Sequence, residues 1–350
     1  MPIRSLPALL ALVLLLPLAP RTAAAGEKPI LRIYTWSEFF DGGVLAAFED
    51  AHDCIVAIDT FDSNEAMLED LTDGRDEVHP YDIVTPSSYM AEEMRRKGLL
   101  RALDHRLIPN LANIDPAFPS LTEDPEMRHS VPYTRTVTGI GYNRSLGDLR
   151  KSWSVFGRKD LTGRLTMLDD MRESLGAALK YLGHSLNTTD PAQVAAAGGV
   201  LREWRGNLAR FEVDEANIGL GSGELLAVHG YNGDMAVLME SNESIGFFVP
   251  EEGSAITTDA FIVMAGSENP DLAHAFINHL LDTETAARNM TGILYYMPVP
   301  EALELLSDEI KHNPAFAVPE KTLAKCEVIR NLGENIAIYE KVWEMVRSGN

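Results

Sequence analysis

The chain has 350 residues, with 52 acidic side chains against 30 Lys and Arg and a formal net charge of −22. This charge argues against binding to nucleic acid or to an anionic membrane surface, because clustered basic residues recognise both of these partners. Hydrophobic residues make up 45% of the chain, which is ordinary for a globular protein and excludes a disordered polyanion. At about 150 residues per domain, the length predicts two domains.

The first 25 residues have the layout of a secretory signal peptide. Arg4 supplies an early positive charge, residues 6–19 are almost entirely apolar, and Ala23–Ala25 offer small residues for cleavage. The apolar stretch is short and contains prolines, which disfavours a transmembrane helix, although an uncleaved anchor remains the alternative. We therefore expect the mature chain to work outside the cytoplasmic membrane, in a bacterial periplasm.

Strand and helix patterns alternate along the mature chain and predict an α/β protein. Strands are expected over 31–35, 54–58, 81–85, 129–143, 165–168, 225–229, 246–249 and 260–265. Helices are expected over 43–51, 64–72, 90–98, 173–182, 192–208, 272–281, 283–290 and 332–347. Ser63 is placed to be the N-cap of the helix over 64–72. The opening β-α-β-α order predicts parallel strands with helices on both faces of the sheet.

Two extended crossovers, near residues 136 and 258, are expected to join two lobes. The first lobe comprises residues 26–136 and 259–322, and the second comprises residues 137–258 and 323–350. Each lobe is long enough to bury a core of its own.

Aromatic and polar side chains follow most of the expected strands at the points where the strands end. In open α/β sheets the ligand lies beyond the carboxyl ends of the strands, so these side chains are expected to line one cleft. They include rings, hydroxyls and acids but no lysine, which suits a cation with an apolar body, because rings and carboxylates both attract ammonium groups. The candidates are Trp36, Ser37, Glu38, Ser87, Tyr89, Asp169, Asp170, Glu173, Tyr231, Asp234 and Asp259.

Some of these residues also have a purely structural interpretation. Asp169 or Asp170 could simply cap the helix that contains Glu173, and Trp36 could be a core aromatic. Asp170 and Glu173 could in principle form a glycosidase pair, but nothing in the sequence fixes their separation.

Motifs for other kinds of chemistry are weak. The nine histidines lack metal-ligand spacing, so neither a metal nor a cofactor is expected. The Gly219–Gly223 segment lacks the spacing of a phosphate-binding turn and is expected to be a flexible loop. No nucleophile motif is present. Cys54 and Cys326 could form one long-range disulfide or remain two separate buried thiols.

Several short segments match one known family in order and spacing. They are Tyr34–Glu38, Asp62–Met67, Tyr81–Tyr89, Val131–Tyr133, Gly139–Asn143, Leu168–Glu173, Tyr181–Gly183, Asn187–Pro191 and Asn232–Asp234. On these segments the chain resembles the periplasmic spermidine/putrescine-binding proteins of ABC uptake systems over essentially its whole mature length. The resemblance implies a two-lobed type II periplasmic binding protein, in which each lobe is a mixed sheet flanked by helices and the ligand lies in a cleft between the lobes.

The resemblance also implies that particular residues line this cleft. Its walls would consist of Trp36, Ser37, Glu38, Phe39, Ser87, Tyr89, Tyr231 and Tyr295. By position, Asp259 would meet a central or terminal amine, while Asp170 and Glu173 would hold the far amine. Asp234 lies where putrescine-preferring members have an acid.

The chain departs from the family at several of these positions. Phe39 replaces a usual Tyr, and Tyr231 replaces a Trp but can still stack. Thr257 replaces another Trp and so removes a ring face, which is worth roughly 0.5–2 kcal/mol of cation–π attraction in a dry site. Val213 and Ile329 replace polar residues of the family. Arg135, close to the crossover, would oppose a cationic ligand unless it is paired or points outward.

Three functions are open at this point. The first is a periplasmic, monomeric binding protein that captures putrescine- or spermidine-like polycations and delivers them to a membrane ABC permease. The second is a norspermidine or spermidine sensor that signals to a membrane cyclic-di-GMP enzyme. The third, a secreted hydrolase, would require turnover of a substrate.

Overall fold

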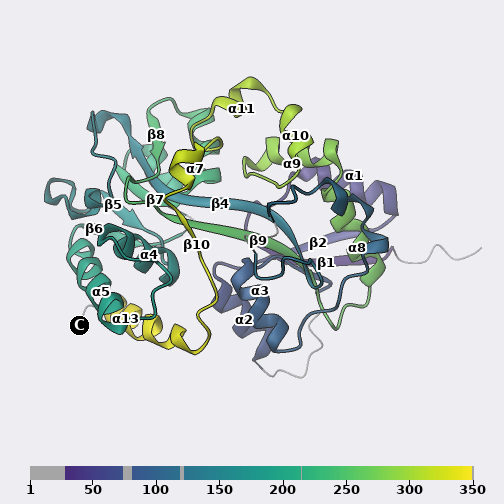
Figure 1. Ribbon diagram of the computed structural model, residues 1–350. Coiled ribbons are helices and arrows are strands. Elements are labelled where there is room, and N and C mark those ends of the chain that lie inside the picture. Colours follow the sequence, from purple (N-terminus) through teal and green to yellow (C-terminus); the bar gives the residue numbers. More distant parts are fainter. Residues whose placement is uncertain (1–27, 74–80, 119–121, 214, 349–350) are drawn as a thin grey trace, which may run out of the picture.

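The computed structural model describes residues 28–73, 81–118, 122–213 and 215–348, so the expected signal peptide lies outside the described residues. Two α/β lobes lie side by side, and two long strands run from one into the other (Figure 1). The strands are β1 (Ile30–Thr35), β2 (Ile55–Thr60), β3 (Ile83–Val84), β4 (Ser130–Asn143), β5 (Leu165–Met167), β6 (Leu208–Phe211), β7 (Ala227–Tyr231), β8 (Ile245–Phe248), β9 (Ala255–Val263) and β10 (Glu327–Val328).

Helices cover the sheet in both lobes (Figure 1). They are α1 (Gly42–His52), α2 (Asn64–Thr72), α3 (Ser88–Arg96), α4 (Met171–Tyr181), α5 (Pro191–Arg205), α6 (Ala216–Ser222), α7 (Asn232–Ser241), α8 (Pro270–Leu280), α9 (Thr283–Ile293), α10 (Pro300–Glu304), α11 (Asp308–His312), α12 (Glu320–Leu323) and α13 (Ile336–Ser348). None of these described helices is long and apolar enough to cross a membrane.

The sheet is mixed, with the strand order β2-β1-β3-β9-β4-β7-β5-β6. β1 pairs in parallel with β2 and β3, as the opening β-α-β-α pattern predicts. β9 then lies antiparallel to both β3 and β4. In the second lobe β5 is parallel to β6 and β7, while β4 is antiparallel to β7 and β8.

β4 and β9 form the connection between the lobes. The first part of β4 pairs with β9 as far as Val137, which lies opposite Ile256, and from Thr138 onward β4 pairs with β7. The register places Thr136 opposite Thr257 at this change of partner. One strand pair therefore belongs to both lobes.

Separate apolar clusters stabilise the two sides of the molecule. On one side Phe48 of α1 packs edge-on against Phe276 of α8, with ring centroids 5.0 Å apart. On the other side Trp153 and Leu201 belong to a cluster that includes Tyr339 of the C-terminal helix α13. Full burial of each such side chain contributes about 1.5–3 kcal/mol. The first cluster also includes Leu220 of α6 and Met235 of α7, so it extends into the second lobe.

Among the predictions made from short sequence motifs, one is confirmed by the structure and another is wrong. Ser63 is the N-cap of α2, and its hydroxyl accepts a hydrogen bond from Ala66 N at 3.1 Å. The expected loop over Gly219–Gly223 was wrong, because residues up to Ser222 belong to helix α6 and Gly223 ends it in the left-handed conformation. A Cβ at Gly219 would lie 2.7 Å from Leu225, so the glycine allows close packing rather than flexibility.

The structure corrects one further expectation and decides between two alternatives that the sequence left open. Helix α5 stops at Arg205 instead of continuing to Leu208, which begins strand β6. Cys54 and Cys326 are both free thiols, so the possible disulfide between them is absent.

Candidate functional site

A cavity lies where the two lobes meet. Its lining consists of Trp36, Ser37, Phe39, Phe61, Asp62, Asn64, Ser87, Tyr89, Thr136, Asp170, Glu173, Val213, Tyr231, Asp234, Thr257, Asp259, Tyr295 and Ile329. Every candidate residue is in this set except Asp169 and Glu38, and Glu38 is exposed in the turn after β1 with φ 52°. Segments far apart in the sequence therefore converge on one place.

The sequence interpretation missed four lining residues. Phe61 and Asp62 directly follow β2, so the strand-end rule would have found them had it been applied to that strand. Asn64 begins α2 in a segment already noted for its resemblance. Thr136 lies in the middle of β4, where only the alternation of that strand could have indicated it.

Asp259 is a buried carboxylate on β9, with 4% of its surface exposed. Ser87 Oγ donates to its Oδ1 at 3.0 Å, and Thr134 Oγ1 donates to its Oδ2 at 2.9 Å. Burial raises its pKa to about 6, and the hydrogen bonds oppose this rise. The indole Nε1–H of Trp36 lies near enough to lower the same pKa, although it makes no hydrogen bond of normal geometry.

Glu173 is a second buried carboxylate, in the first turn of α4. Thr138 Oγ1 donates to its Oε2 at 2.7 Å and Thr257 Oγ1 donates to its Oε1 at 3.1 Å. Burial raises its pKa to about 8, and the neighbouring carboxylate of Asp170 adds to this rise. Thr257 thus uses its hydroxyl to hold this acid.

His229 lies behind Glu173 and does not neutralise it. Its Nε2 is 4.0 Å from Glu173 Oε2, and both ring nitrogens are buried without a hydrogen-bond partner among the described residues. Burial lowers the pKa of His229 to about 3, so the ring is uncharged near neutral pH.

Asp170 has both of the roles considered for it. Its side chain lines the cavity, and its Oδ1 also accepts a hydrogen bond from Glu173 N at 2.9 Å, so it caps α4. Asp169 instead forms an ion pair with Arg347 at 3.0 Å. Burial raises the pKa of Asp170, and the positive charge of Arg172 opposes that effect.

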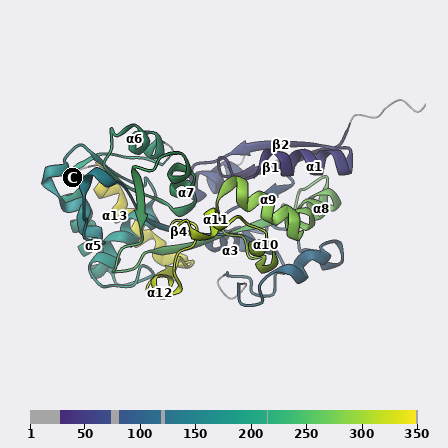
Figure 2. The same ribbon diagram turned by 90° about the horizontal axis from the view of Figure 1, so that it is seen from above.

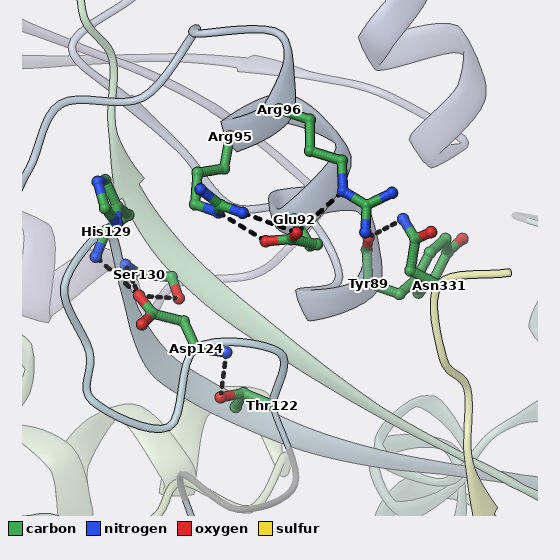
Figure 3. Close-up of polar contacts among 9 residues, drawn as sticks. All are labelled: Tyr89, Glu92, Arg95, Arg96, Thr122, Asp124, His129, Ser130 and Asn331. Carbon is green, nitrogen blue, oxygen red and sulfur yellow. Dashed lines mark hydrogen bonds and ion pairs between the residues drawn. The ribbon is translucent and has the colours of Figure 1, made fainter. Parts of the chain in front are cut away.

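Asn64 and Asn331 fix the ring of Tyr89 in the cavity wall. Asn64 Nδ2 donates to Tyr89 OH at 3.0 Å and to Ser87 Oγ at 3.2 Å. Asn331, on the C-terminal segment, donates from Nδ2 to the Tyr89 carbonyl at 3.1 Å (Figure 3). The wall is therefore held from both ends before any ligand enters. Among the other walls, Trp36 packs on Phe61, with ring centroids 4.4 Å apart.

The described lining contains five acids and no Lys, Arg or His. Arg135 is turned away, with its guanidinium 4.3 Å from the ring centre of Tyr296. Strand alternation explains this orientation, because Thr134 and Thr136 take the cavity side of β4. Within the described residues, no group of three or more His, Cys, Asp or Glu is placed to hold a metal ion. The arrangement suits an organic cation.

Comparison with known proteins agrees with this geometry. A family model described as bacterial extracellular solute-binding protein matches residues 43–318. The spermidine/putrescine-binding periplasmic protein of Salmonella typhimurium is 30% identical over 336 residues, covering 95% of this chain and 96% of that one. The putrescine/cadaverine-binding protein of Pseudomonas aeruginosa is 31% identical over 340 residues, with coverage of 93% and 95%.

Solved structures of related proteins also superpose on this chain. A putative spermidine/putrescine ABC transporter protein from Listeria monocytogenes superposes with a TM-score of 0.85 at 30% identity, covering 92% of this chain and all of that one. A Treponema pallidum lipoprotein superposes with a TM-score of 0.82 at 31% identity, with coverage of 91% and 99%. The chain therefore belongs to the bacterial extracellular solute-binding proteins and, within them, to the periplasmic spermidine/putrescine-binding family.

Proposed function

We propose that this protein binds a putrescine- or spermidine-like polyamine in the interlobe cavity and delivers it to a membrane ABC permease. The observation that carries this proposal is the lining itself, which combines five acids and six aromatic rings with no basic side chain among the described residues. Rings attract ammonium groups and cover methylenes, while carboxylates accept charge-assisted hydrogen bonds. A polyamine has both of these chemical parts.

The buried acids form two groups. Asp259 is held by a side chain of β4 and by Ser87, the N-cap of α3, whereas Asp170 and Glu173 share the start of α4. A ligand with amines at both ends satisfies both groups. A ligand with only one amine leaves a buried carboxylate unpaired, which costs several kcal/mol or keeps that acid protonated.

Delivery from a periplasmic location is proposed on two grounds. The relatives named above are periplasmic binding proteins, and the first 25 residues have the pattern of a secretory signal. Delivery to a permease is preferred to signalling because the similar Listeria structure is described as part of an ABC transporter. Deletion of the gene should abolish uptake of labelled polyamine at low external concentration; unchanged uptake with altered cyclic-di-GMP would favour the sensor.

The direct test is titration of the purified mature protein with putrescine, cadaverine, spermidine, norspermidine and spermine. Binding to the folded state should raise the melting temperature as ligand concentration increases. Butanediol, which has the length of putrescine without its charges, is the matched control and should give no shift. No shift with any polyamine, together with a shift from an amino acid or a sugar, would overturn the proposal.

Polyamine binding should release protons and tighten as pH rises. In the unliganded cavity burial raises the pKa of Glu173 to about 8 and that of Asp259 to about 6. An ammonium group favours the carboxylate forms, so protons leave as the ligand enters and affinity increases with pH across this window. Calorimetry near pH 7 in phosphate and in Tris should show release of about one proton per ligand. Identical heats in the two buffers would contradict this result.

Replacing Thr257 with valine should weaken binding about 10-fold or more near pH 7, because a hydrogen bond to a charged acceptor contributes about 1.5–3 kcal/mol. The substitution keeps the shape of the side chain and removes the hydroxyl that donates to Glu173 Oε1. In a Glu173→Gln background the same change should have much less effect, because the charged acceptor is already gone. Additive losses in the double variant would show that Thr257 acts elsewhere.

A further inference from the structure

The Asn232-Gly233-Asp234 segment at the start of α7 makes contacts that ligand recognition does not require. Asn232 is buried, with 2% of its surface exposed. Its Oδ1 accepts a hydrogen bond from Val137 N at 2.8 Å, and its Nδ2 donates to the carbonyl of Ala315 at 2.9 Å. Val137 is where β4 changes partner from β9 to β7, so Asn232 fastens α7 to the crossover strand.

Gly233 lies directly against the ring of Tyr295. A Cβ at Gly233 would lie 2.4–2.5 Å from three ring atoms, Cζ, Cε1 and Cε2. The ring therefore packs against the backbone of α7 and fills the space that a side chain at Gly233 would occupy. Tyr295 follows α9, and Figure 2 shows α7 of one lobe facing α9 of the other. This contact joins the two lobes.

Asp234 fixes the same ring through its hydroxyl. Tyr295 OH donates to Asp234 Oδ1 at 2.6 Å. The next residue, Tyr296, accepts a hydrogen bond at its carbonyl from Arg135 N of β4 at 2.9 Å. The tyrosine pair is thus anchored to the crossover strand on one side and to α7 on the other.

We propose that Gly233 and Asp234 form the surface of α7 against which Tyr295 packs when the two lobes close. By stabilising the closed form, this contact sets the affinity for every polyamine. This inference rests on the proposed function. Gly233 and Asp234 are positioning residues in this role, because they act through Tyr295. When only the closed form binds, the apparent dissociation constant varies inversely with the fraction of closed protein. A weaker contact with Tyr295 therefore lowers the affinity for every ligand by the same factor.

The test is Gly233→Ala. Gly233 has no positive φ, so alanine is compatible with the backbone. The added methyl group would meet Tyr295 only when the lobes are closed, so the unliganded variant should melt close to the wild-type temperature. Its affinities for putrescine and spermidine should both fall at least 10-fold with their ratio unchanged. Small-angle scattering should no longer show compaction at ligand concentrations that saturate the wild type.

Two further variants make the design specific. Gly199→Ala in α5, where no atom lies within 4 Å of the added Cβ, is the matched control and should bind like the wild type. In a Tyr295→Ala background the Gly233→Ala change should cause no further loss, because the ring that it obstructs has been removed. Wild-type affinity in Gly233→Ala, or a changed putrescine-to-spermidine ratio, would overturn the inference. Failure of the wild type itself to bind polyamines would instead overturn the proposed function.

Discussion

Replacing Asp259 with asparagine is expected to remove most polyamine binding while leaving the fold intact. Asp259 is buried, and no basic side chain lines the cavity in the described residues, so an incoming ammonium group is its natural counter-charge. Truncating one partner of a buried, hydrogen-bonded charge pair costs about 2–5 kcal/mol, which corresponds to a loss of about 30-fold or more. Asparagine keeps the shape of the side chain and can still hydrogen-bond to Ser87 and Thr134. Calorimetric titration with putrescine and spermidine measures the loss.

The same variant should be at least as stable as the wild type without ligand. The folded-state pKa of Asp259 is raised from 3.8 to about 6, so between these values the native protein holds more protons than the unfolded chain. Stability therefore falls as pH rises through this window, and the cost, about 3 kcal/mol at most, is fully present above the higher value. Asparagine lacks that cost. The difference in melting temperature should disappear at about pH 4 and below.

Asp62→Asn is the matched control for this experiment. Asp62 also lines the cavity, but it is exposed, so solvent already screens its charge. Its replacement should change affinity only a few-fold. Equal losses in the two variants would show that total negative charge, rather than the buried position of Asp259, attracts the ligand. Wild-type binding by Asp259→Asn would show that the site lies elsewhere.

Replacing Arg172 with alanine should destabilise the fold by about 3 kcal/mol. The Arg172 side chain is 1% exposed and donates to the carbonyl of Arg330 at 3.0 Å and to Asn187 Oδ1 at 2.9 Å. Its guanidinium also lies 5.8 Å from the ring centre of Tyr89 and 5.1 Å from that of Tyr339. Alanine leaves a void and removes both of these hydrogen bonds where α4 meets the C-terminal segment. Denaturant unfolding of the unliganded protein measures the loss.

Two arginine variants control for charge and for the residue type. Arg158→Ala removes a more exposed arginine that is paired with Asp160, and such a pair is worth about 0–1 kcal/mol. Arg172→Lys keeps the charge near Asp170 and Glu173 but loses the planar fork, so it should restore only part of the stability. An unfolding free energy of Arg172→Ala within 1 kcal/mol of the wild type would contradict the structural role of the guanidinium.

The sequence predicted the cavity better than it predicted the sheet. Strand ends indicated Trp36, Ser87 and Asp170 because the carboxyl ends of neighbouring strands meet at one edge, which is a local rule. The antiparallel direction of β9 could not be predicted, because it depends on how the chain returns after the second lobe has formed. Helix α6 was missed because glycine favours turns in isolation, whereas Gly219 is required by close packing against Leu225.

The polar contacts behind the site could not be predicted from the sequence either. Nothing in the sequence indicates that Thr257 donates to Glu173, since the two residues are 84 positions apart. The outward orientation of Arg135 follows from strand alternation only once the direction of Thr134 is known. Residue types at strand ends could be predicted, but the hydroxyls that hold the acids depend on tertiary register.

The crossover strand β4 has one more consequence. Thr134 holds Asp259, and Thr138 holds Glu173. The two hydroxyl-bearing residues lie four positions apart on one strand, so their backbone separation is about 13 Å. That length is a property of the backbone and does not depend on side-chain rotamers. Under the proposed function, β4 therefore sets the distance between the two threonines that hold the buried acids at the amine-binding positions.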